Sequence, residues 1–234
     1  MVTRKDLLFL VVLVLFFSPF FLFDEVYRSY YRFNLEHGVL MSFVKFAILA
    51  TLGEVIGLRI KTGRYHQKGF GLIPRAIVWG FLGITIYMAF AIFSAGTPVF
   101  LEKVGFADAG RTLDGLLSWR KVVVAFSIST ALNLFYAPVL MTFHKITDLH
   151  ILENGGTLKG FLKPIDFARV FHEINWDVQW NFVFKRTIPL FWIPAQTFTF
   201  LLPEEFRVLF AAFLGIVLGV LLAIAALKSL PLKN

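Results

Sequence analysis

The sequence predicts an all-α integral membrane protein, built as a polytopic bundle of about six transmembrane helices. Apolar residues fill 58% of its 234 positions, and charged residues only 16%. Soluble domains are about 45–50% apolar and about 25% charged, so a soluble fold of this length has too little interior for so many apolar side chains. The apolar residues are also gathered into runs that approach the ~20 residues a helix needs to cross a bilayer.

Six apolar runs follow one another along the chain. They are residues 7–23, 39–60, 73–93, 122–143, 182–202 and 208–227. The first run is short and follows charged residues, so a signal peptide is the competing interpretation. No small-x-small cleavage site follows it, and we therefore expect a retained helix.

The later runs differ in how apolar they are. The second contains a carboxylate, Glu54, and the third begins beside Arg75. Pro138 interrupts the fourth run, Pro189 and Pro194 interrupt the fifth, and the sixth is the most apolar. If Lys185 and Arg186 lie at the membrane interface, the fifth span begins nearer Pro189 and is short and broken by proline, a form that often marks solute pathways.

These runs divide the chain into three parts. Residues 1–38 hold an N-terminal transmembrane helix and a linker, residues 39–228 the helix bundle, and residues 229–234 a tail. Within the bundle, residues 144–180 form the longest polar stretch. Phe167, Val170 and Phe171 have the spacing of one helix face there, which predicts an interfacial helix in this polar loop.

The net charge of +8 is distributed unevenly over the predicted loops. With six spans, the side that carries both termini also receives residues 61–72 and 144–180, and with them most of the Lys and Arg. Such an excess marks the cytoplasmic side, so we expect both termini to be cytoplasmic. No single segment forms the compact basic face of a nucleic-acid interface, and we expect no nucleic-acid partner.

Polar residues within or beside the apolar runs are the candidate functional residues, because burying them in a bilayer is costly. Two interpretations stay open for Glu54: an ion pair with Arg75 that only holds helices together, or a place on a path for solutes or protons. Asn133 and Gln196 have the same ambiguity, and the Gln196 amide could bond across helices or to carbonyls freed by the nearby proline. The full set is Glu54, Arg75, Asn133, Gln196 and Arg207.

Two glycine pairs have the G-x-x-x-G spacing, Gly53 with Gly57 and Gly215 with Gly219. Small residues at this spacing allow two membrane helices to approach closely. The sequence does not decide whether the pairs pack within one chain or between two copies, so a homo-oligomer stays open.

Motifs of enzymes and of cofactor sites are missing from the sequence. It has no H-E-x-x-H, G-x-S-x-G or P-loop pattern, and without cysteine it has no thiolate ligand or nucleophile. His144 and His150 flank Asp148, but histidines at this spacing in a polar segment are usually plain polar residues. We therefore expect a protein that is not an enzyme, with no catalytic residue, no metal and no cofactor.

The last third of the chain carries a spaced pattern of aromatic, proline, amide and arginine residues. Its members are Trp192, Pro194, Gln196, Thr199, Phe200, Pro203 and Arg207. Three earlier segments precede it in order: Gly53-Glu54, then Arg75 with Gly80 and Gly83, then Ala137-Pro138. Together they resemble the 22-kDa peroxisomal membrane protein / Mpv-seventeen family of small integral membrane proteins, of which the chain looks like a divergent member.

The resemblance covers residues 39–227 and leaves out the first apolar run. It implies a bundle of four or five family-like helices with the N-terminal helix as an addition, organelle membranes in eukaryotes and, for some members, a pore that passes small solutes. Three positions depart from the family pattern: Thr199 stands in place of Asn, Ile84 in place of Pro, and Leu132 in place of an acid.

The expected function is that of a channel or transport-like protein that passes small solutes, with the lipid bilayer and those solutes as partners. The alternative is a structural or regulatory membrane protein without a path, in which the same polar residues only staple helices. No arginine-rich, acid-poor transit peptide is visible, which favours the plasma membrane of a prokaryote over a mitochondrial inner or peroxisomal membrane.

Overall fold

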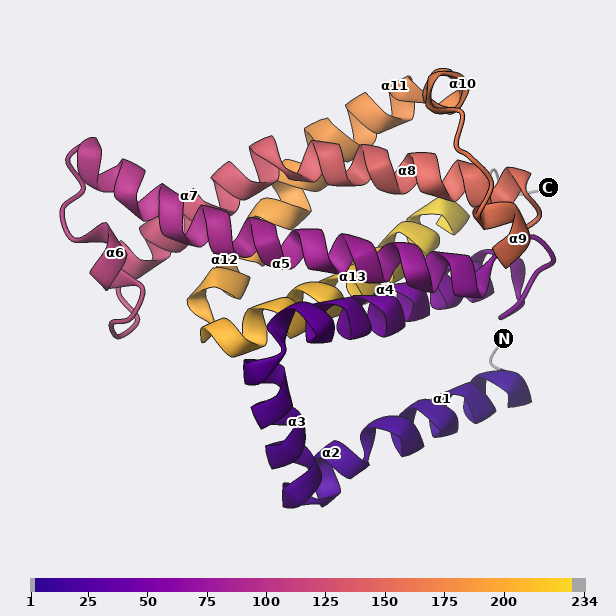
Figure 1. Cartoon of the computed structure of the whole chain (residues 1–234), viewed down its shortest axis with the longest axis horizontal. Coiled ribbons are helices and arrows are strands. Elements are labelled where there is room, and N and C mark those ends of the chain that lie inside the picture. The colour runs from indigo at the N-terminus through magenta and orange to yellow at the C-terminus, as the bar shows by residue number, and fades with distance from the viewer. Residues whose placement is uncertain (1–2, 229–234) are drawn as a thin grey trace. The chain divides into compact units, whose positions relative to one another are not determined.

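Helices make up 83% of the chain in the computed structural model (Figure 1). The structure describes residues 3–228, and the exposure of side chains as far as residue 221. No β-strand occurs among the described residues. The all-α fold class predicted from composition is therefore confirmed.

The chain divides into two units, Met1–Met41 and Ser42–Asn234. The first unit contains α1 (Arg4–Phe17), α2 (Pro19–Leu22) and α3 (Asp24–Glu36). The boundary between the units falls inside α4 (Gly38–Thr62).

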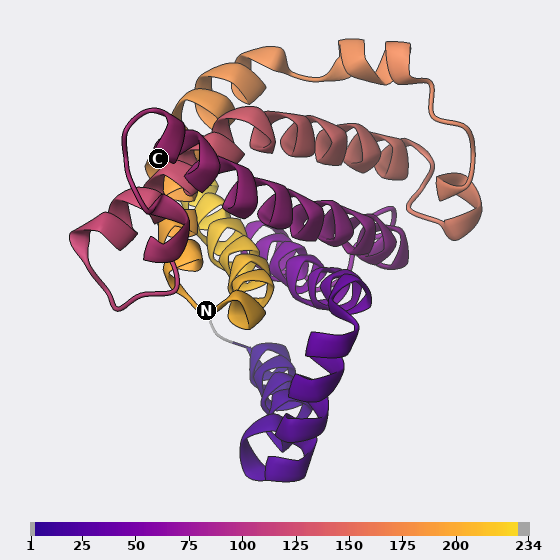
Figure 2. The same cartoon turned by 60° about the vertical axis from the view of Figure 1, so that its left-hand side comes forward.

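The second unit continues from α4 through ten further helices among the described residues. They are α5 (Leu72–Lys103), α6 (Ala109–Thr112), α7 (Trp119–Phe135), α8 (Ala137–Glu153), α9 (Leu158–Phe161), α10 (Phe167–Glu173), α11 (Trp176–Val178), the π-helix η1 (Gln179–Trp192), α12 (Ile193–Leu201) and α13 (Glu204–Lys228). Both views show α5 lying between α4 and α8 (Figures 1 and 2). That order places one face of α5 against α4 and another against α8.

Two helices are long and apolar enough to cross a membrane, α4 and α5. The pair α7 and α8 adds a third span if the two helices, bent by 43° at their junction, are counted together. Two or three such spans among the described residues are consistent with an integral membrane protein. They correct the prediction of six.

Two of the six predicted spans, the first and the fifth, are too short for identifiable reasons. The first run is divided at Ser18, because Pro19 begins a new helix; α1 keeps 14 residues, or about 21 Å, which is shorter than a hydrocarbon core of about 30 Å. The fifth run changes from π-helix to α-helix between Trp192 and Ile193, and neither piece reaches the ~20 residues of a span. The sixth run falls in α13, and its last residues, together with the predicted tail at 229–234, lie outside the residues whose side chains are described.

Prolines explain the main helix junctions of the second unit. Pro138 stands in the first turn of α8 and Pro194 in the first turn of α12. The ring of proline clashes with a preceding helical turn and offers no N–H, so each proline bends or restarts the helix. Pro203 separates α12 from α13 in the same way. The predicted interruption of the fourth run thus becomes the bend between α7 and α8.

Glycines set how closely α4 approaches its neighbours. A Cβ added at Gly53 would lie 2.9 Å from the Ile216 Cα, and one at Gly219 would lie 3.2 Å from the Gly53 carbonyl oxygen. The two G-x-x-x-G motifs therefore pack against each other within one chain, which answers the question that the sequence left open. On the other side, a Cβ at Gly83 would lie 2.6 Å from the Ser42 carbonyl oxygen, and Gly80 accommodates the Phe43 ring.

The replacement Gly53→Ala should destabilise the protein by about 1–3 kcal/mol, because the new methyl group would press on the α13 backbone, which cannot rotate away. Gly215→Ala is the matched control. A Cβ at Gly215 has nothing within 4 Å, so this change should be neutral or should stabilise the helix by up to ~1 kcal/mol. Thermal unfolding of the purified variants in detergent measures both. Equal effects of the two changes would contradict the α4–α13 contact.

Candidate functional site

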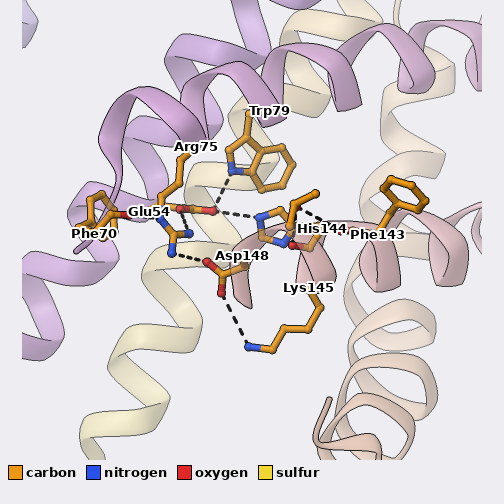
Figure 3. Close-up of polar contacts among 9 residues, drawn as sticks. Glu54, Phe70, Arg75, Trp79, Phe143, His144, Lys145 and Asp148 are labelled. Carbon is orange, nitrogen blue, oxygen red and sulfur yellow. Dashed lines mark hydrogen bonds and ion pairs between the residues drawn. The ribbon is translucent and has the colours of Figure 1, made fainter. Parts of the chain in front are cut away.

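Arg75 holds two carboxylates from two other helices (Figure 3). Its Nη1 donates to Glu54 Oε2 of α4 at 2.5 Å, and its Nη2 forms an ion pair with Asp148 Oδ1 of α8. Its Nε donates to the Phe70 carbonyl oxygen at 2.6 Å, and the guanidinium lies 4.7 Å from the centre of the Phe70 ring. One side chain of α5 thus ties together α4, α5 and α8.

Glu54 uses its second oxygen for two further partners. Trp79 Nε1 donates to Glu54 Oε1 at 2.8 Å, and His144 Nε2 lies 3.0 Å from the same atom. The Trp79 and His144 rings pack together with their centres 4.4 Å apart. We call Glu54, Arg75, Trp79, His144, Lys145 and Asp148 the Arg75 network.

Helical spacing explains why these residues meet. Arg75 and Trp79 stand four positions apart on α5, and His144 and Asp148 stand four apart on α8. Residues at that spacing share one face of a helix, so each helix presents two polar groups to Glu54 and Arg75. The sequence interpretation paired Glu54 with Arg75 but missed Trp79, His144 and Asp148. The repeated four-residue spacing is the signal that could have found them.

A glycine fixes where α5 begins, and so where Arg75 lies. Gly71 precedes the helix with φ +72, a left-handed conformation that side-chain-bearing residues rarely adopt, and its carbonyl oxygen accepts from the Arg75 N–H at 2.9 Å. A Cβ at Gly71 would collide with Ile151 and would lie 3.0 Å from the Gly156 Cα. The start of α5 is therefore pressed against the end of α8 and the turn that follows it.

The Arg75 network is mostly buried but opens on one side. The side chain of Arg75 is 8% exposed, whereas that of His144 is 24% exposed. Lys145 is 40% exposed and lies 3.7 Å from Asp148 Oδ2. Two carboxylates are therefore matched by two basic side chains, Arg75 and Lys145, and His144 adds an imidazole to the network.

Asn133 and Gln196 belong to a different contact, between α7 and α12. Asn133 Nδ2 donates to the Ser129 carbonyl oxygen at 2.9 Å, and Ser129 Oγ donates to the Ile193 carbonyl oxygen at 2.7 Å. Gln196 is buried, and its Oε1 has no hydrogen-bond partner among the described residues. No hydrogen bond or ion pair that the structure describes joins this pair to the Arg75 network. The predicted candidate residues are thus divided between two places.

Arg207 and the remaining residues of the family-like pattern lie at helix junctions. Arg207 Nε donates to the Leu202 carbonyl oxygen at 3.1 Å, at the end of α12, and its guanidinium lies 5.7 Å from the centre of the Phe200 ring. Phe200 is fully buried and contacts Phe90 of α5. Trp192 packs against a buried apolar cluster formed by Ala137, Ile188 and Ile193. These contacts stabilise the helix junctions.

Nothing in this helical fold specifically indicates an enzyme. Within residues 3–228, no group of three or more histidines and carboxylates is arranged to hold a metal ion. His150 instead donates to the Phe161 carbonyl oxygen at 3.2 Å, on a different side of α8 from the Arg75 network. Comparisons with known proteins found no matching family model, no matching curated protein and no matching solved structure.

Replacing Arg75 with Met should lower the free energy of unfolding by about 3–5 kcal/mol, because Glu54 and Asp148 would stay buried without their cation. Further replacement of both carboxylates, by Glu54→Gln and Asp148→Asn, should recover part of that loss. Denaturant or thermal unfolding in detergent gives both values.

Arg169→Met is the matched control for this experiment. Arg169 also bridges two carboxylates, Glu153 and Glu173, at 2.6 Å each, but on the surface, where solvent weakens such pairs. We expect little change in stability. If Arg75→Met costs no more than Arg169→Met, the Arg75 network does not hold the helices together.

Proposed function

We propose that the chain is an integral membrane protein that passes small solutes, as a channel or a transport-like protein. The observation that supports this best is the Arg75 network itself. Charged and titratable side chains lie between α4 and α5, the two helices that can cross a membrane, and the network is accessible at His144. Ionisable residues inside membrane helices commonly mark ion or solute pathways.

Energetics favour a role beyond helix stapling. A buried ion pair is a weak way to stabilise a fold, because the cost of removing its charges from water can exceed their attraction. Apolar packing of similar volume is often as stable. A cluster with four charged residues and a histidine is therefore better explained by a use for its charges.

The network lies near one end of the helices. Glu54 comes eight residues before the end of α4, Arg75 three residues after the start of α5, and Asp148 five residues before the end of α8. At ~1.5 Å per residue, all three lie within about 12 Å of those helix ends. We propose that the network is a charged mouth of the path, where a solute exchanges contacts with Glu54 and His144.

A second candidate function is favoured by the completeness of the pairing. Both oxygens of Glu54 have partners, and Arg75 bonds through all three of its nitrogens. A closed network of this kind also fits a structural or regulatory membrane protein with no path. The separation of Asn133 and Gln196 from the network points the same way.

The family resemblance supports the first candidate, since some members pass small solutes. The plasma membrane of a prokaryote, with both termini in the cytoplasm, is the setting that we propose from the loop charges and from the lack of a transit signal. The lipid bilayer is the partner that the proposal requires.

Purified protein in liposomes should release entrapped small solutes. Glu54→Gln should change the ratio of cation to anion release by about tenfold, the effect of about 1.4 kcal/mol on a barrier, because one fixed negative charge at the mouth is lost. Glu153→Gln is the matched control. It removes a carboxylate that is also paired with an arginine, on the exposed surface, and should leave the ratio unchanged.

Liposomes that stay tight under varied voltage and pH would reject the solute path. If release occurs but Glu54→Gln lowers only the melting temperature, the Arg75 network only holds the helices together and the solute path lies elsewhere.

A further inference from the structure

Two basic segments, far apart in the sequence, come together at one end of the second unit. The first is the connection between α4 and α5, at residues 61–68, and the second surrounds α9, at residues 159–163. A Cβ at Gly156 would lie 2.5 Å from the Gly69 carbonyl oxygen and 2.6 Å from the Gly71 N, so the two connections are in direct backbone contact. α9 also contacts α5 and α8.

Five cations of these segments project into the medium. They are Lys61, Arg64, Lys68, Lys159 and Lys163, and we call them the basic rim. All five are exposed, and none forms an ion pair with a residue that the structure describes. Neither segment contains an acidic residue. The five cations of the rim are therefore free to meet an anion from outside the chain.

Two other cations at this end, Arg169 and Lys145, are paired with carboxylates. Arg169 binds Glu153 and Glu173, and hydrogen bonds to these carboxylates raise the pKa of its guanidinium above the usual range. Lys145 pairs with Asp148. The five cations of the basic rim differ from these, because no described carboxylate forms an ion pair with them.

Exposed apolar side chains lie among the cations of the rim. Leu162, next to Lys163, is 79% exposed, and Leu158, next to Lys159, is 45% exposed. At the start of α5, Ile73 is 57% exposed. Apolar side chains contribute nothing to the binding of a free anion in water. A lipid, in contrast, has an anionic headgroup and an apolar chain side by side.

We propose that the basic rim binds the headgroups of anionic lipids in the leaflet around this end of the helices. The two segments lie at the ends of α4, α5 and α8, where headgroups meet a membrane protein. This surface is not visible in the sequence, because each segment alone has only two or three cations and the contact of Gly71 with Gly156 brings the segments together. This binding surface is independent of any solute path.

Lipid titration of the detergent-purified, full-length protein tests the proposal. Phosphatidylglycerol should bind and raise the melting temperature, and phosphatidylcholine should not. The double variant Lys159→Gln/Lys163→Gln should weaken the apparent affinity for phosphatidylglycerol by about tenfold or more, since each basic residue near the headgroups contributes about a fivefold factor. Arg64→Gln/Lys68→Gln, on the other segment, should weaken it similarly.

Lys103→Gln/Arg111→Gln is the matched control, because it removes the same charge from two exposed cations near the opposite end of α5. It should leave the affinity unchanged. Equal binding of the two lipids, or an equal loss in the control, would overturn the proposal. Inorganic phosphate that reproduces the thermal shift without lipid would also overturn it, by assigning the rim to a free anion. Loss of solute release in liposomes has no bearing on these readouts.

Discussion

The burial of one arginine is the constraint on which the second unit depends. Arg75 stays charged in any protein environment, so it can be buried only where carboxylates and carbonyls meet its nitrogens. Glu54, Asp148 and the Phe70 carbonyl meet this need from α4, α8 and the loop before α5. Sliding any one of these helices by a turn would break a pair, so the network fixes the register of all three.

Composition, with 58% apolar residues, predicted an all-helical membrane protein; the helical fold is confirmed, and the two or three helices long enough to cross a membrane are consistent with the rest. The number of spans was not predictable from hydropathy, since Pro19 and the change of helix type at Trp192 break runs that look continuous. The Glu54–Arg75 pair could be predicted, because the two opposite charges lie in or beside two consecutive apolar runs. The contact of His144 with Glu54 was harder to predict, because the two residues stand 90 positions apart and only the four-residue spacing of His144 and Asp148 on α8 points to it.

The candidate polar residues predicted from the sequence lie in different parts of the structure. Glu54 and Arg75 form the core of a charge network, whereas Asn133 and Gln196 belong to the contact of α7 with α12. Arg207 donates a hydrogen bond to the Leu202 carbonyl oxygen at the end of α12. The glycines of the family-like pattern allow close helix approach. The residues of this sequence pattern therefore lie in several separate helix contacts. Only Glu54 and Arg75 belong to a charge network.

The contact of Gly71 with Gly156 has a consequence for engineering the chain. Surface loops normally tolerate added residues. Here, however, the connection before α5 is wedged between the end of α8 and its turn, and lengthening it would move Arg75 away from both carboxylates. An epitope tag or a fluorescent fusion is better placed at Leu116, which is 93% exposed in the connection between α6 and α7.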